Sequence, residues 1–105
     1  MKKIKLWEVL VPERDNAGKL FRIKHHRKLD KRIRKLSGGL TILKSAKGQW
    51  VHETTKKVVA EKMIPVRFHS TKKEAKKIGC FTRKHYNQEK VLVYEISNEV
   101  LEIEK

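Results

Sequence analysis

The sequence predicts an α+β fold, a ferredoxin-like β-α-β-β-α-β arrangement with two helices on one face of an antiparallel sheet. Segments with the two-residue alternation of strands and segments with the three-to-four spacing of helices follow one another in that order along the 105 residues. Turn-forming residues separate them at 12–18 and 37–39. This length fits a single domain, 1–105, with an acidic C-terminal strand and tail at 91–105.

The first half of the chain is expected to form a strand, a helix and a second strand. Residues 4–11 alternate, with Trp7, Val9 and Val11 on one face. A helix is expected from about residue 19 to 36, where Phe21, His25, Leu29, Ile33 and Leu36 form one stripe. Ser37-Gly38-Gly39 is typical of a helix C-terminus, because glycine tolerates the left-handed conformation found there. The second strand lies within 40–51, with a bulge or bend at Gly48.

The second half repeats this order after a hairpin turn at 52–56. The third strand is expected at about 57–68, with Ile64, Val66 and Phe68 facing inward. Thr71 and Glu74 have the spacing of a capping box, which begins the second helix. The inner stripe of this helix comprises Ala75, Ile78 and Thr82, with Tyr86 near its end. Residues 90–96 form the fourth strand, and 100–104 extend it or add an edge strand.

One residue and one surface do not fit this fold comfortably. Pro65 lies in a strand that would be central, where proline removes a ladder hydrogen bond, so a bulge or another strand order is expected there.

The uncovered face of the sheet has no pair of aromatic residues for stacking bases. It is expected to carry Leu6, Glu8, Leu10, Met63, Arg67, Val91 and Val93. A contiguous apolar face is usually covered, which predicts a homodimer formed through it.

Charge is the strongest compositional feature. The net charge is +15, and residues 1–90 hold 26 Lys/Arg against 8 Asp/Glu. Such a field attracts polyanions such as nucleic acid. Cations expected to contact phosphates are Lys24, Arg27, Lys28, Lys31, Arg32, Arg34, Lys35, Lys72, Lys73, Lys76, Lys77, Arg83 and Lys84. The alternative is a solvated helix surface in a lysine-rich proteome.

His25, His26 and Asp30 form the cluster that most resembles a catalytic site. His26 and Asp30 are four residues apart and so share a helix face, which would suit a metal ligand pair or an oriented base. No third ligand has diagnostic spacing, so no metal site and no cofactor is predicted. The alternative is a half-buried histidine beside a surface His–Asp pair. We therefore expect a protein that is not an enzyme, and keep a small metal-dependent nuclease as a further alternative.

Other candidate groups carry weaker chemistry. Tyr86, next to His85 late in the second helix, invites comparison with relaxases and single-strand DNA transposases, which use a helix tyrosine as nucleophile. Their metal is bound by a His-hydrophobe-His strand motif, and Arg67-Phe68-His69 lacks its first histidine. Glu8 or Asp15 could serve a metal-dependent ribonuclease. Cys80 is the only cysteine, which excludes an internal disulfide and a cysteine zinc site and favours a cytoplasmic location. No apolar run approaches the length of a membrane span.

Scattered short motifs resemble small prokaryotic and phage proteins of similar length. They are Trp7-Glu-Val-Leu-Val-Pro, Asp15-Asn-Ala-Gly-Lys-x-Phe, His25-His26, Gly38-Gly39-x-Thr41, Gly48-Gln-Trp50 and Ile64-Pro-Val. The resemblance implies the same fold and a phage or mobile-element setting, but no activity. Three functions stay open: a basic nucleic-acid-binding or regulatory protein, a homodimeric module that binds a protein or small anionic ligand, and the nuclease.

Overall fold

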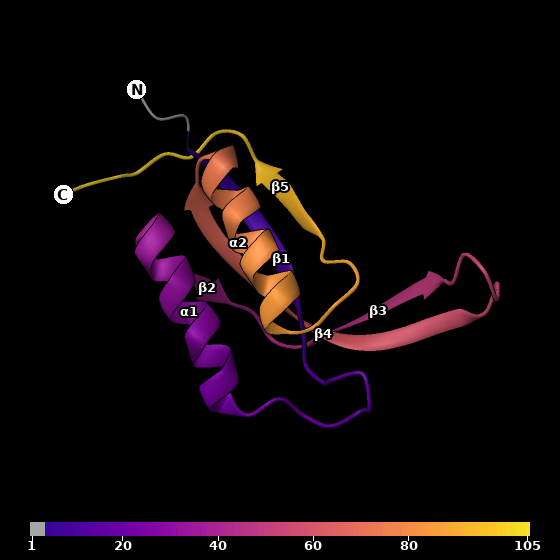
Figure 1. Cartoon of the computed structure of the whole chain (residues 1–105). Coiled ribbons are helices and arrows are strands. Elements are labelled where there is room, and N and C mark those ends of the chain that lie inside the picture. Colours follow the sequence, from indigo (N-terminus) through magenta and orange to yellow (C-terminus); the bar gives the residue numbers. More distant parts are fainter. Residues whose placement is uncertain (1–3) are drawn as a thin grey trace.

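The computed structural model describes residues 4–105 and has two helices packed on a five-stranded antiparallel sheet (Figure 1). In chain order the elements are β1 (Lys5–Pro12), α1 (Ile23–Ser37), β2 (Thr41–Ile42), β3 (Ala46–Val51), β4 (Val58–Ser70), α2 (Lys72–His85) and β5 (Val93–Ser97). The hydrogen-bonded order is β2-β4-β1-β5, and β3 also pairs with β4. The predicted α+β, ferredoxin-like fold is confirmed.

The core lies between the sheet and the two helices, which cover the same face (Figure 1). The predicted inward residues of β1 and β4 lie there; Ile64 is partly buried, the others are buried, and Val9 and Phe68 are almost fully inaccessible. Leu29 and Ile33 from α1 meet Ala75 and Ile78 from α2. Spacings of three and four bring these residues onto one side of each helix, so the charged residues are left facing outward.

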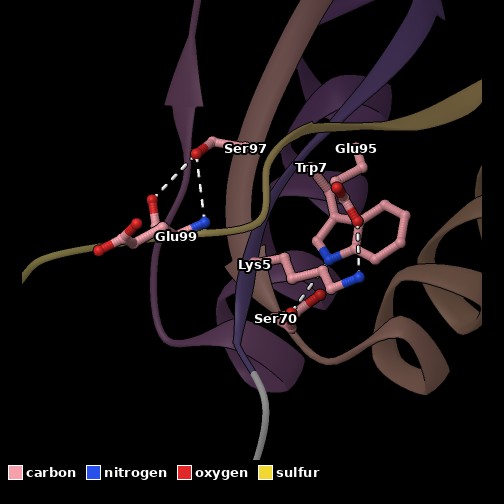
Figure 2. Close-up of polar contacts among 6 residues, drawn as sticks. All are labelled: Lys5, Trp7, Ser70, Glu95, Ser97 and Glu99. Atoms are coloured by element: carbon pink, nitrogen blue, oxygen red, sulfur yellow. Dashed lines mark hydrogen bonds and ion pairs between the residues drawn. The ribbon is translucent and has the colours of Figure 1, made fainter.

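Side chains fix where α2 begins. Thr71 Oγ1 accepts from the Glu74 amide while Glu74 Oε1 accepts from the Thr71 amide, which completes the predicted capping box. The buried Trp7 indole donates to the Ser70 carbonyl at 3.0 Å (Figure 2). This bond ties the last residue of β4, which precedes the helix N-cap, to β1.

The first helix begins later than predicted, at Ile23 instead of about residue 19. Asp15 Oδ1 accepts from the amides of Ala17 and Lys19, and the Phe21 amide donates to the Glu13 carbonyl. These bonds stabilise a loop through residues 13–21 in place of a helical turn.

Pro65 lies in central strand β4, and no bulge is needed to accommodate it. It is opposite Leu10 of β1, while its carbonyl accepts from the Leu43 amide on the other side at 2.9 Å. The nitrogen and carbonyl of a strand residue project toward the same neighbour. The missing N–H therefore faces residues 43–45, where β2 has ended and β3 has not begun, so the expected second strand is divided there.

Three smaller expectations are corrected. Gly48 pairs with Glu61 in an unbroken ladder, so it marks no bulge. Residues 100–104 form no strand. Val93 pairs with Val9 and packs with Val91 against the core, so Tyr94 takes the place on the uncovered face that we expected for these valines.

The β3–β4 hairpin projects from the body as an arm (Figure 1). Its predicted turn at 52–56 is closed by hydrogen bonds between the backbones of His52 and Lys57, and of Lys56 and His52. The arm gives the molecule its 50 Å long axis, against 29 and 23 Å in the other directions. Hairpin residues thus lie beyond the cover of the helices.

Candidate functional site

The outer surfaces of the two helices form one cationic face. All thirteen predicted phosphate-contacting cations are exposed. They are Lys24, Arg27, Lys28, Lys31, Arg32, Arg34 and Lys35 on α1, with Lys72, Lys73, Lys76, Lys77, Arg83 and Lys84 on α2. Because both helices cover the same side of the sheet, these charges share one side of the molecule (Figure 1).

Few acidic groups neutralise this cationic face. Asp30 and Glu74 are the acidic residues of the two helices. Within residues 4–105 the ion pairs join Lys5 with Glu95 and Arg67 with Glu8, so neither uses a helix cation. Arg32 lies 5.0 Å from the ring centre of Phe81 and thereby links the helices.

The predicted His25–His26 region forms a histidine–tyrosine cluster with His85 and Tyr86, which joins α1 to the end of α2. His25 Nε2 donates to the His85 carbonyl and His85 Nε2 donates to the His25 carbonyl, each at 2.7 Å. The two rings stack at 3.7 Å. The buried Tyr86 hydroxyl meets His26 Nδ1 at 2.7 Å. These side chains are therefore bonded from helix to helix.

Burial sets the ionisation of this cluster. It lowers the pKa of His25 and of His26 below the ordinary value of 6.5, and neighbouring histidines add to the effect. Burial also raises the pKa of Asp30 above 3.8, and it raises the pKa of Tyr86 strongly. Burial therefore favours the neutral imidazoles of His25 and His26 and the protonated phenol of Tyr86.

The structure does not assemble the predicted catalytic residues into a reactive group. His26 is hydrogen-bonded to Tyr86, and no hydrogen bond links it to Asp30 within the described part of the chain. His69 lies on β4 next to β1, away from the cluster. No three metal-ligating side chains come together among residues 4–105. We assign the cluster a packing role between the helices.

Asp15 and Cys80, the other candidates for chemistry, lie outside the histidine–tyrosine cluster. Asp15 Oδ1 accepts two loop amides. Cys80 is exposed on α2. No helix within residues 4–105 is long and apolar enough to cross a membrane.

The uncovered face of the sheet carries a row of three polar side chains across three strands. Glu8 on β1 lies between Arg67 on β4 and Tyr94 on β5. Arg67 Nε donates to Glu8 Oε1 at 2.8 Å, and the Tyr94 hydroxyl donates to Glu8 Oε2. Burial and this bond raise the pKa of Tyr94 to about 12. Glu8 is thus a buried carboxylate on a face that no helix covers.

Apolar side chains surround this polar row. Leu6 and Leu10 alternate with Glu8 along β1, and Pro65 and Met63 continue the face along β4. Leu92 and Ile96, on either side of Tyr94 in the sequence, are exposed by 56% and 39%. We define the open face as Leu6, Glu8, Leu10, Met63, Pro65, Arg67 and Tyr94.

The arm continues the open face away from the body. Strand alternation places Glu61 and Val59 on the same side of β4 as Met63. Across the ladder, Val59 pairs with Trp50, which is 43% exposed. Burial raises the pKa of Glu61. An aromatic ring and a partly buried carboxylate therefore lie two ladder positions apart on one side of the arm.

Sequence reasoning missed Tyr94, Trp50 and Glu61. Tyr94 was missed because the two faces of the last strand were assigned the wrong way round, with Val91 and Val93 on the uncovered face. The sequence signal for the other two was the hairpin turn: once His52 faces Lys57 across it, the ladder pairs Trp50 with Val59 and Gly48 with Glu61.

The histidine–tyrosine cluster predicts a pH dependence of stability. Because the folded state lowers the pKa of His25 and His26, the unfolded chain binds more protons below pH 6.5. The contribution of these histidines to the free energy of unfolding should reach its maximum above pH 6.5 and should decrease as the pH falls below 6.5. Urea unfolding from pH 8 to 5.5 measures this change. Asp30, whose pKa is raised by burial, acts in the opposite direction, so the histidine variants below are needed to separate the two effects.

The double variant His25→Gln/His26→Gln should flatten that pH dependence. His69→Gln is the matched control, since His69 is exposed and lies outside the cluster. An equally steep loss of stability in the double variant would contradict the assignment.

Comparison with known proteins finds likeness in structure alone. No protein-family model matches the sequence, and no curated protein matches it significantly. A phage SAM lyase in complex with S-methyl-5′-thioadenosine is similar with a TM-score of 0.70 and 14% identity, over 93% of this chain and 84% of that one. CutA1 from Oryza sativa is similar with a TM-score of 0.70 and 11% identity, over 96% and 84%. The divalent cation tolerance protein CutA1 from Thermus thermophilus has a TM-score of 0.66 and 11% identity, over 96% and 87%. At these identities the chain shares their fold.

Proposed function

We propose that this protein is a self-associating ferredoxin-like module that binds a small nucleoside-type ligand at its arm. The observation that carries the proposal is the continuous open face, which runs from the Glu8 row to Trp50 without a helix to cover it. A contiguous apolar patch on a protein surface marks a site of interaction with a partner or ligand. A second copy of the chain is a natural cover, in agreement with the homodimer expected from the sequence.

The buried ion pair supports association through this face. A carboxylate that is already satisfied by Arg67 and Tyr94 can enter an apolar interface with less desolvation cost than a free one. The row also fixes how the two copies align, because a misaligned partner would place apolar side chains against the polar groups of Glu8, Arg67 and Tyr94.

The ligand class rests on the arm. Trp50 offers a ring on which a base can stack, and Glu61 offers a carboxylate that can accept hydrogen bonds from ribose hydroxyls. The likeness to a phage SAM lyase that holds S-methyl-5′-thioadenosine supports this choice of ligand and a phage or mobile-element setting. We propose S-methyl-5′-thioadenosine or S-adenosylmethionine as the ligand.

Leu10→Asp should separate the copies. Leu10 lies on the open face next to Pro65, so a charge there would be buried in the interface. Sedimentation equilibrium should give a multiple of the 12.4 kDa chain mass for the parent protein and a smaller mass for the variant, which has lost the open-face contact. Lys31→Glu, on exposed α1 surface, is the control and should stay associated. A parent protein that is monomeric at every concentration tested would refute this part of the proposal.

Ligand binding should depend on Trp50 and Glu61. Calorimetric titration with S-methyl-5′-thioadenosine and with S-adenosylmethionine should give saturable binding to the parent chain. Trp50→Ala should weaken it by about tenfold or more, as loss of one stacked base does. Glu61→Gln should weaken it less, and Glu53→Gln, at the tip of the arm, should leave it unchanged. Chromatography of the S-adenosylmethionine sample for released S-methyl-5′-thioadenosine tests turnover. Absence of binding by either compound would exclude this ligand class.

A second candidate function is nucleic-acid binding by the cationic face. It is favoured by thirteen exposed cations on one side of the molecule, none of them in the ion pairs of the described residues. Such a surface binds phosphate backbones with affinity that falls as salt rises, and with little sequence preference.

Charge reversal tests this second function. The affinity for a DNA duplex is measured by fluorescence anisotropy at several salt concentrations. The magnitude of the slope of log affinity against log salt concentration should decrease by about 1 for each phosphate contact removed. Lys31→Glu and Lys76→Glu should each lower both the affinity and the magnitude of this slope. Lys62→Glu, on the arm, is the control. If neither DNA nor RNA binds at about 50 mM salt, where counterion release is most favourable, this function is excluded.

A further inference from the structure

The C-terminal segment 99–104 has the pattern of a strand but pairs with no strand among residues 4–105. Leu101 and Ile103 are exposed by 74% and 86%, the highest values among the large hydrophobic residues of the described chain. Glu102 and Glu104 alternate with them. The segment forms no helix or strand. An extended conformation would place the two apolar side chains on one side and the two carboxylates on the other.

A turn at Ser97 directs this segment away from its own sheet edge. Ser97 Oγ donates to the Glu99 carbonyl at 2.9 Å and accepts from the Glu99 amide at 3.3 Å. Figure 2 shows the chain turning at these bonds and leaving β5. It then passes the start of α2 (Figure 1). The segment therefore does not fold back on β5 as a hairpin.

The edge that would accept such a strand is open. In the described sheet β5 has one neighbour, β1, so the other edge of β5 presents unpaired backbone groups. An extended segment can add to an edge of this kind through main-chain hydrogen bonds, while adjacent pockets take its alternate side chains.

A groove of about 370 Å³ lies beside this edge, between α2 and the β5 region. Its apolar lining includes Trp7, Val91 and Val93. Lys72, Lys76 and Arg83 border it. Gly79 allows the helix to approach closely, because a Cβ there would lie 2.8 Å from Val93 Cγ2. The groove thus joins an apolar floor to a cationic rim.

We infer that residues 99–104 of one copy add as a strand to the open edge of β5 in a second copy, with Leu101 and Ile103 along the groove beside α2. The occupant matches the groove in two respects. Apolar side chains meet an apolar floor, and Glu99, which strand alternation places on the same side as Leu101 and Ile103, meets the cationic rim. This interaction does not use the open face, so it is independent of the association proposed above.

Cys80 makes the contact measurable, because it lines the groove and is the only cysteine. In the full-length Lys105→Cys variant, a short bismaleimide should join the introduced thiol to that of Cys80, each adding across one maleimide double bond. Mixed ¹⁴N and ¹⁵N chains analysed by mass spectrometry should give links between Cys80 of a light chain and position 105 of a heavy chain, and the reverse. A link confined to one chain would overturn the inference.

Matched variants separate docking from random collision. Thr54→Cys, at the tip of the arm, sets the background yield. Leu101→Ser/Ile103→Ser and Lys76→Glu/Arg83→Glu, each combined with Lys105→Cys, should reduce the yield to that background while circular dichroism reports an intact fold. The link should persist in a Leu10→Asp background, so its failure is distinguishable from failure of open-face association. A yield for Lys105→Cys no greater than that for Thr54→Cys would overturn the inference.

Discussion

Both helices pack on the same face of the sheet, and this arrangement leaves the opposite face without a helix to cover it (Figure 1). The buried apolar residues of α1 and α2 all pack against the inner face, so the thirteen helix cations point outward together. The opposite face is left with Leu6 and Leu10 around a buried Glu8. The chain thus has one strongly charged side and one apolar side. Each side fits a different class of partner.

The polar row explains how a carboxylate is retained on the apolar side. Glu8 receives one hydrogen bond from each neighbouring strand, from Arg67 and from Tyr94, so both of its oxygens are occupied. Removing one partner would leave a buried charge incompletely satisfied, which is far more costly than removing an exposed pair. The row therefore requires β1, β4 and β5 to keep their register. The arm, as the continuation of β4, has its orientation fixed by the same strand.

The fold could be predicted from local sequence patterns. The features that could not be predicted depend on contacts between residues that are distant in the sequence. The capping box at Thr71 and the stripe around Ile33 depend on neighbouring residues and were confirmed. The break opposite Pro65 depends on where β2 and β3 pair with β4. The face of Tyr94 depends on a register with β1 that contains an irregularity. The His25–His85 bonds join residues 60 positions apart, so the sequence offered the histidines without their partners.

The central claim is that the open face and the arm are covered by a second copy in solution. Hydrogen–deuterium exchange of the full chain, followed by mass spectrometry at high and low protein concentration, tests it directly. Amides of β1 and of the arm, residues 46–63, should exchange slowly in the concentrated sample and faster on dilution, while those of the α2 core around Ile78 should not change. Identical exchange of the arm at both concentrations, at the rate of an uncovered hairpin, would contradict the account.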